Sequence, residues 1–147
     1  LQQAPCTFTV TVRDEEVSVR TQGLRCDACG WETQDLAGGA QLAQAAADAY
    51  RRKHRLLTSD ELRTRRERLG MAQEAFAGWL SVGIASIKRW EGAHVQERAM
   101  DELIRLKTDP DALVDAVKAV RARLAKARAN RTPKRALGTT RKTARSA

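Results

Sequence analysis

Residues 7–25 alternate between β-branched or aromatic residues and polar ones, the pattern of a half-buried β-strand. The apolar positions that share one face are Phe8, Val10, Val12, Val17 and Val19. An acidic break at residues 14–16 interrupts the alternation. The sequence therefore predicts a β-hairpin with an acidic turn.

Beyond residue 34 the apolar spacing changes to three and four residues, which is typical of amphipathic helices. The predicted helices cover residues 35–57, 59–69, two helices within 73–91, 96–107 and 111–127. The positions expected to face inward are Leu42, Ala46, Ala49, Tyr50, Leu62, Leu69, Ala99, Leu103 and Leu106. The last helix carries its own stripe, Leu113, Val117, Val120 and Leu124, which either packs on the domain or pairs with a second copy.

Several boundaries carry local signals. Thr58 and Glu61 fit a capping box that opens the helix at residue 59, and Gly70 ends that helix. Pro110 suits the first position of the last helix, because that position needs no N–H donor. Arg51, Arg52, Lys53 and Arg55 near the end of the 35–57 helix suit the negative end of its dipole.

The segment 73–91, QEAFAGWLSVGIASIKRWE, predicts two short helices that pack across a tight turn. Its expected core positions are Phe76, Ala77, Leu80, Val82, Ile87 and Trp90. The outward positions of its second helix, Ala85, Ser86, Lys88 and Arg89, are short or basic. A helix that enters the major groove of DNA needs such a face, since bulky or acidic side chains would clash with DNA or repel phosphate. The alternative interpretation is a helical hairpin in some other all-α domain.

The net charge of +9 is unevenly distributed along the 147 residues. Ten Lys and Arg residues and no acid follow position 120, leaving 17 bases against 18 acids in residues 1–120. The basic character belongs to the C-terminal end, where low apolar content over residues 128–147 predicts a disordered tail. High basicity alone is therefore weak support for nucleic-acid binding.

Three cysteines, Cys6, Cys26 and Cys29, form an odd set that argues against a disulfide framework. Cys26 and Cys29 lie in a CxxCG turn after a strand, the shape of a zinc knuckle, but a tetrahedral structural Zn²⁺ site needs four ligands. His54 and His94 are expected in helices and outside such a site. Three interpretations stay open: a zinc ribbon that lacks its first knuckle, upstream of Leu1; a metal-free remnant; or a site that Cys6 completes with water or a partner chain.

No run of eighteen apolar residues and no basic-then-apolar leader occurs, so the sequence predicts neither a membrane span nor a signal peptide. We expect a cytoplasmic, nucleoid-associated protein. No paired-carboxylate, Ser/His/Asp or Cys/His arrangement is evident, so we do not expect an enzyme.

Residues 58–108 resemble the Xre/Cro-type helix-turn-helix family. Gln73 stands where that family places a glutamine that bonds a DNA phosphate, and Ser81 replaces the glycine usual at the turn. Arg89-Trp90-Glu91 resembles the motif that closes the family's recognition helix, with Trp90 in the core and Arg89 directed at DNA.

Residues 7–115 taken together resemble the MqsA (YgiT-like) antitoxin family of bacterial toxin–antitoxin systems. The matching segments are 23–30 (GLRCDACG), 57–62 (LTSDEL) and 82–91 (VGIASIKRWE). The resemblance implies a zinc-bearing N-terminal domain that binds a toxin and a C-terminal domain that dimerises and represses its own operon. The family's asparagine and arginine that read DNA fall on Ala85 and Arg89.

We therefore expect a mainly α fold with a small N-terminal β-hairpin, in which a Cro/C1-type helix-turn-helix bundle follows a partial zinc-ribbon-like module. The expected parts are the hairpin and knuckle module (1–34), a linking helix (35–57), the helix-turn-helix domain (58–127) and the basic tail (128–147). The expected DNA-binding residues are Gln73, Gly83, Ile84, Ala85, Ser86, Lys88 and Arg89, and the metal half-site is Cys26 and Cys29.

The expected function is that of a homodimeric, sequence-specific repressor of a palindromic double-stranded operator, in the role of a type II antitoxin. The alternative is a protein-interaction module that chiefly neutralises a cognate toxin through its N-terminal domain.

Overall fold

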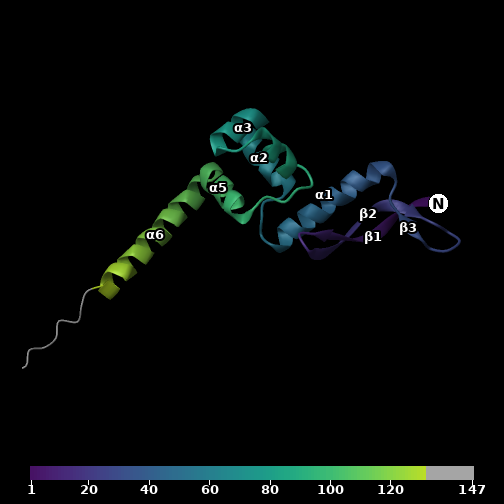
Figure 1. The fold of residues 1–147 in the computed structure, drawn as a ribbon, viewed down its shortest axis with the longest axis horizontal. Coiled ribbons are helices and arrows are strands. Elements are labelled where there is room, and N and C mark those ends of the chain that lie inside the picture. Colours follow the sequence, from purple (N-terminus) through teal and green to yellow (C-terminus); the bar gives the residue numbers. More distant parts are fainter. Residues whose placement is uncertain (132–147) are drawn as a thin grey trace, which may run out of the picture. The chain divides into compact units, whose positions relative to one another are not determined.

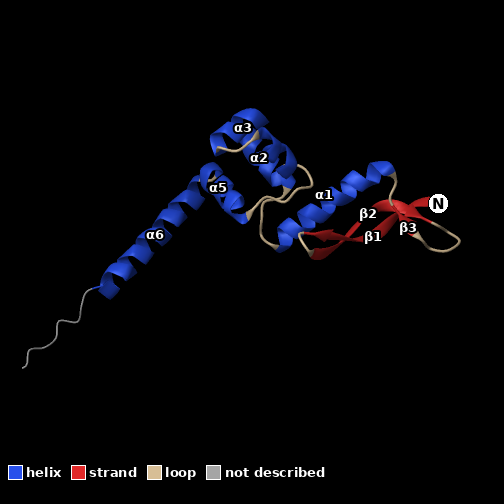
Figure 2. Ribbon diagram, viewed as in Figure 1, coloured by secondary structure: helices blue, strands red, loops and turns tan. Residues whose placement is uncertain are grey.

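A computed structural model describes residues 1–131 of the chain, which are mainly helical with an N-terminal antiparallel β-hairpin, as the sequence predicted (Figures 1 and 2). The strands are β1 (Gln2–Val12), β2 (Glu15–Arg25) and β3 (Glu32–Thr33). The helices are α1 (Leu36–Lys53), α2 (Ser59–Arg68), α3 (Gln73–Leu80), α4 (Ile84–Trp90), α5 (Arg98–Thr108) and α6 (Pro110–Arg131). None of these helices is long and apolar enough to cross a membrane.

Residues 1–110 form one compact unit, and the remaining described residues, 111–131, belong to a second. The predicted domain boundaries at residues 34/35 and 57/58 both lie within the first unit. The predicted disordered tail lies mostly outside the described residues, but its first part is helical, because α6 continues past residue 127 to Arg131.

The hairpin is longer than the sequence predicted. β1 begins at Gln2 rather than near residue 7, and its register pairs Gln2 with Arg25 and Val12 with Glu15. Residues 2–6 belong to the strand because the alternation of buried and exposed positions continues through Cys6, which is fully buried. The turn consists of Arg13 and Asp14, both left-handed at φ 49° and 64°, a two-residue form that matches strand twist.

Helix α1 packs on the hairpin and forms the first core with it (Figure 1). This core contains Val17, Val19 and Ala46, against which Val10, Val12, Leu42, Ala45, Ala49 and Tyr50 pack. Asp35 caps the start of α1 by accepting from the Gly38 amide at 2.5 Å. The helix ends at Lys53 rather than 57, because Arg55 adopts φ 57° and the chain then buries Leu56 and Leu57.

The second core joins α2, α3, α4 and α5. Its buried members are Leu57, Leu62, Phe76, Ala77, Leu80, Ile87 and Ile104. Two predicted inward positions are wrong: Leu69 is 42% exposed just beyond the end of α2, and Ala99 is exposed in the first turn of α5. Ile104, which the sequence pattern did not single out, is fully buried, three residues after Asp101 on the same buried face of α5.

The predicted boundary signals are confirmed at three places. Thr58 and Glu61 form both halves of the capping box on α2. Gly70 adopts φ 65° after α2, a conformation that glycine adopts without a steric penalty. Pro110 is the first residue of α6.

Candidate nucleic-acid interface

Helices α3 and α4 are joined by a tight turn that Ser81 makes in the left-handed conformation, at φ 59° and ψ 40°. The Val82 amide closes the end of α3 by donating to the Ala77 carbonyl at 2.9 Å. Gly83 then caps α4, and the Ser86 amide donates to its carbonyl at 2.9 Å. This turn allows Ile87 of α4 to pack, 2% exposed, in the same core as Phe76 and Leu80 of α3.

The outward face of α4 is short and basic, as its sequence indicated. Gly83, Ile84, Ala85, Lys88 and Arg89 are exposed, while Ser86 is half-buried. No carboxylate in residues 1–131 forms an ion pair with Lys88 or Arg89. The Arg89 side chain lies back along α4, with Nε donating to the Ala85 carbonyl at 3.2 Å. The face therefore presents two cations beside an apolar residue, Ile84, that is 39% exposed.

Gln73 differs from the other predicted DNA-binding residues. It opens α3, but its Nε2 donates to Glu91 Oε2 at 2.9 Å, and the side chain is half-buried. One of its two side-chain amide hydrogens is therefore used in a hydrogen bond within the protein, and Gln73 helps to hold Glu91 at the end of α4.

Glu91 anchors the C-terminal end of α4. Its carboxylate accepts from Arg66 Nε at 2.5 Å and Arg66 Nη2 at 3.0 Å, and Arg66 Nη1 also donates to the Met71 carbonyl at 2.9 Å. Burial opposes ionisation of Glu91, but hydrogen bonds from Arg66 and Gln73 and the charges of Arg66 and Arg63 outweigh it and lower the pKa of the carboxyl. The Arg66 side chain is only 11% exposed because it forms this pair.

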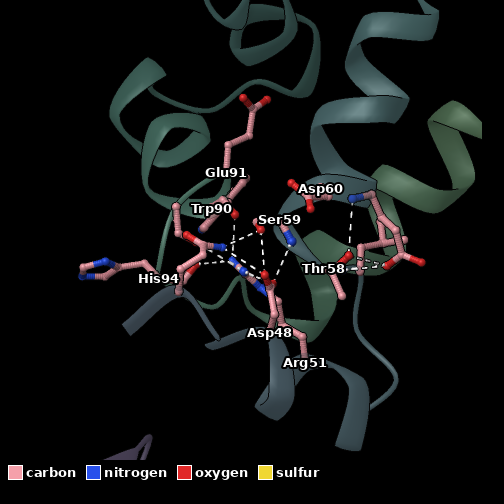
Figure 3. A network of polar contacts seen from close by, with 12 residues as sticks. Asp48, Arg51, Thr58, Ser59, Asp60, Trp90, Glu91 and His94 are labelled. Atoms are coloured by element: carbon pink, nitrogen blue, oxygen red, sulfur yellow. Dashed lines mark hydrogen bonds and ion pairs between the residues drawn. The ribbon is translucent and has the colours of Figure 1, made fainter. Parts of the chain in front are cut away.

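Arg51 of α1 holds the loop that follows α4, as Figure 3 shows. The side chain is fully buried, and its Nη2 donates to the carbonyls of Trp90 at 2.7 Å and His94 at 2.6 Å. Its Nη1 donates to Asp48 at 2.7 Å and to the Gly92 carbonyl at 3.2 Å, and its Nε donates to Gln96 at 3.0 Å. The Trp90 carbonyl is the last of α4, so these contacts place a cation at the C-terminus of this helix, where a positive charge is favourable.

Asp48 extends this network to the start of α2 (Figure 3). One carboxylate oxygen accepts from the Ser59 amide and the other from the Ser59 hydroxyl, both at 2.9 Å. Burial disfavours the charged form of Asp48, but hydrogen bonds from Ser59, Gln44 and Arg51 outweigh it and lower the pKa of the carboxyl. The linking helix is thus tied by charged hydrogen bonds to both α2 and the end of α4.

The role of Arg51 was missed in the sequence. The cluster of basic residues at the end of α1 suits the helix dipole, and Arg52 and Lys53 are indeed exposed there. The available signal was periodicity: Arg51 follows Ala47 by four residues and Asp48 by three, and both of these residues are buried. His94, expected in a helix, lies in the loop between α4 and α5, because this loop must present its carbonyls to Arg51.

The CxxCG segment forms a tight knuckle after β2. The Cys26 amide donates to the Trp31 carbonyl and the Gly30 amide to the Cys26 carbonyl, both at 2.8 Å, with Gly30 at φ 73°. The backbone amides of Cys29 and Ala28 donate to the Cys26 sulfur and lower the pKa of this thiol. Such donors stabilise a thiolate, so Cys26 and Cys29 suit one half of a tetrahedral zinc site.

Cys6 does not join this pair within the chain. It is fully buried in β1 opposite Thr21, with its sulfur 3.3 Å from the Ala4 carbonyl. Across residues 1–131 there is no group of three or more Cys, His, Asp and Glu side chains that could hold a metal ion. Residues 1–131 therefore supply only two of the four ligands that a structural Zn²⁺ site needs at the knuckle, Cys26 and Cys29.

Comparisons with protein-family models, curated proteins and solved structures found no match to this chain.

Proposed function

We propose that this chain is a sequence-specific DNA-binding repressor in which α3, the Ser81 turn and α4 act as a helix-turn-helix, with α4 as the recognition helix. The observation that carries the proposal is the outward face of α4: Lys88 and Arg89 are exposed without a carboxylate partner in residues 1–131, next to small Ala85. The groove-facing side of such a helix needs small residues for close approach and donors for base edges.

Three contacts support a fixed orientation of α4. Ile87 packs in the core, Glu91 pairs with Arg66, and Arg51 binds the carbonyls of the following loop. A helix that reads bases must be held rigidly, since displacement by a fraction of a hydrogen-bond length weakens every base contact.

In this proposal Arg89 donates to a guanine, Lys88 and Ser86 contact base edges or nearby phosphate, and Ile84 contacts a thymine methyl group. Two copies place their α4 helices in successive major grooves of an inverted repeat, roughly 34 Å apart. Occupation of a promoter then excludes polymerase, and no catalysis is required. The role of an antitoxin that represses its own operon rests on the family resemblance of residues 7–115.

The test is a fluorescence-anisotropy titration of the full chain with its own promoter duplex and with a scrambled duplex, at low and at near-physiological salt. We expect a preference for the promoter that survives the higher salt. Equal binding that collapses with salt would contradict the proposal, because it would mean that only phosphate is contacted.

Substitutions at Arg89 sharpen this test. Arg89→Ala is expected to weaken promoter binding by about 1–3 kcal/mol and to relax one base position. Arg89→Lys keeps the charge but lacks the two-pronged donor, so it should lose promoter preference while retaining most binding to the scrambled duplex. Arg20→Ala removes an exposed arginine from β2 and serves as the matched control.

A second candidate function is binding of a partner protein through the N-terminal module. The observation that favours it is Trp31, which is 60% exposed beside the knuckle, since exposed tryptophan is typical of interface anchors. Co-purification of the full chain with the product of the adjoining reading frame tests this candidate. Loss of the complex in Trp31→Ala, with promoter binding unchanged, is the expected result.

A further inference from the structure

Helix α6 carries a narrow exposed apolar stripe. Leu113, Val117, Val120 and Leu124 are 50%, 43%, 53% and 56% exposed, at spacings of four, three and four residues. At 100° per residue these four side chains fall within about 60° of the helix circumference, and Ala127 continues the stripe. Val114, 49% exposed, widens the apolar face only in the first turns of α6. A seam this narrow at heptad spacing is typical of a helix that pairs with one other helix, whereas a membrane-surface helix has a wider apolar face with aromatic residues.

The residues that flank the stripe are basic or uncharged. With Val117 and Leu124 at heptad position a, the e positions are Val114, Arg121 and Arg128, and the g positions are Ala116, Arg123 and Asn130. The three arginines are exposed, and no ion pair within residues 1–131 neutralises them. The sequence contains no acid after Asp115 that could do so from the same helix in a second copy.

This charge pattern disfavours pairing of α6 with itself. In a parallel pair, position g of one helix faces position e of the next heptad in the other, so Arg123 would face Arg128. In an antiparallel pair, e faces e and g faces g, so arginines again meet arginines or uncharged residues. Neither orientation brings together residues of opposite charge at the e and g positions, although the apolar a and d positions could pack in both.

We propose that α6 is a docking helix for an acidic amphipathic helix of another protein, one with aliphatic residues at its a and d positions and Asp or Glu at the flanking e and g positions. Such a partner covers the stripe and pairs with Arg121, Arg123 and Arg128 at once. The proposal is independent of DNA binding by α4 and assigns any dimer contact of this chain to a surface other than the α6 stripe.

The experiment uses the full chain and two synthetic three-heptad peptides with the same Leu/Val core. One peptide has Glu at every e and g position, and the other has Lys. In isothermal titration at near-physiological salt, we expect the acidic peptide to bind at least about tenfold more tightly than the basic one. The triple variant Arg121→Glu/Arg123→Glu/Arg128→Glu should reverse this order.

A matched pair of double variants tests the stripe itself. Val117→Asp/Val120→Asp should abolish binding of the acidic peptide, whereas Ala119→Asp/Ala122→Asp puts the same charges on the opposite face of α6 and should preserve it. Helicity of both variants is compared by circular dichroism. Ala→Asp lowers helix propensity more than Val→Asp does, so any loss of helix should be larger in the control than in the stripe variant.

Three results would overturn the proposal. The first is that the two peptides bind equally or not at all. The second is that sedimentation shows dissociation of the chain's own oligomer in Val117→Asp/Val120→Asp but not in its control. The third is that Val117→Asp/Val120→Asp loses binding to phosphatidylserine vesicles but keeps binding to the acidic peptide. The second result would assign the stripe to another copy of this chain, and the third to a lipid surface.

Discussion

Replacement of Arg51 by methionine is the most direct test of how α1 holds the helices that carry the candidate interface. Methionine has a similar length and keeps most of the packing, but it removes a fully buried guanidinium that donates to Asp48, Gln96 and the carbonyls of Trp90, Gly92 and His94. The carbonyls then lose their partner, and Asp48 loses its opposite charge.

The expected cost follows from this geometry. Five separate bonds to a charged donor would sum to about as much as a small domain's whole stability, so they cannot be added independently. Breaking a buried charged pair by removal of one partner costs about 3–5 kcal/mol. Asp48 keeps its hydrogen bonds from Ser59 and Gln44, which places the expected loss within this range rather than above it.

The assay is urea unfolding of the full chain followed by circular dichroism, with Arg52→Met as the control. Arg52 is the next residue of α1 and is exposed, so its replacement should change the free energy of unfolding by no more than about 0.5 kcal/mol. For Arg51→Met we expect the urea midpoint to fall by roughly 2 M, at an m-value near 2 kcal/mol/M. If Arg51→Met stayed within about 1 kcal/mol of Arg52→Met, the buried network would not be what ties α1 to the loop after α4.

Four further predictions test other parts of the structure. Glu91→Gln should lower the free energy of unfolding by about 1.5–3 kcal/mol at pH 7. Because the pKa of Glu91 is lowered in the folded state, the full difference between the two proteins is present above the unfolded-state pKa, near 4.3, and disappears as pH falls through the lower folded-state pKa. Urea unfolding of both proteins at several pH values measures this. Ser81→Gly should be neutral or stabilising by up to about 1 kcal/mol in thermal unfolding, and Ser81→Val clearly destabilising, because residue 81 has φ 59°. Ile104→Ala should cost about 2–5 kcal/mol in chemical unfolding, since the side chain is fully buried; a value typical of surface sites would contradict its place in the core. Deletion of residues 132–147 removes five Lys and Arg. The slope of log K for DNA binding against log salt concentration should become shallower by up to about 0.9 for each phosphate that those residues neutralise, and the preference for the promoter should be retained. A loss of this preference would mean that residues 132–147 recognise the DNA sequence.

Some features of the candidate interface were predictable from the sequence, and others were not. The exposed positions of α4 were predictable, because in a two-helix hairpin the spacing of Ile87 and Trp90 decides which side chains face out. The commitment of Gln73 to Glu91 was not, since these residues are eighteen positions apart and nothing local couples them. The same holds for Arg66, which pairs with Glu91 across a sequence separation of 25 residues.

By itself, the sequence determined the features that depend on neighbours along the chain. Alternation specified the hairpin, the Thr58–Glu61 capping box opened α2, and Pro110 opened α6, because each involves residues within a few positions of one another. Only the tertiary structure decided which charged side chains are buried. Arg51 and Arg52 are adjacent and chemically identical, yet one is fully buried and the other exposed. The difference arises because the carbonyls that receive Arg51 come from residues 90–94, and folding alone brings that loop to α1.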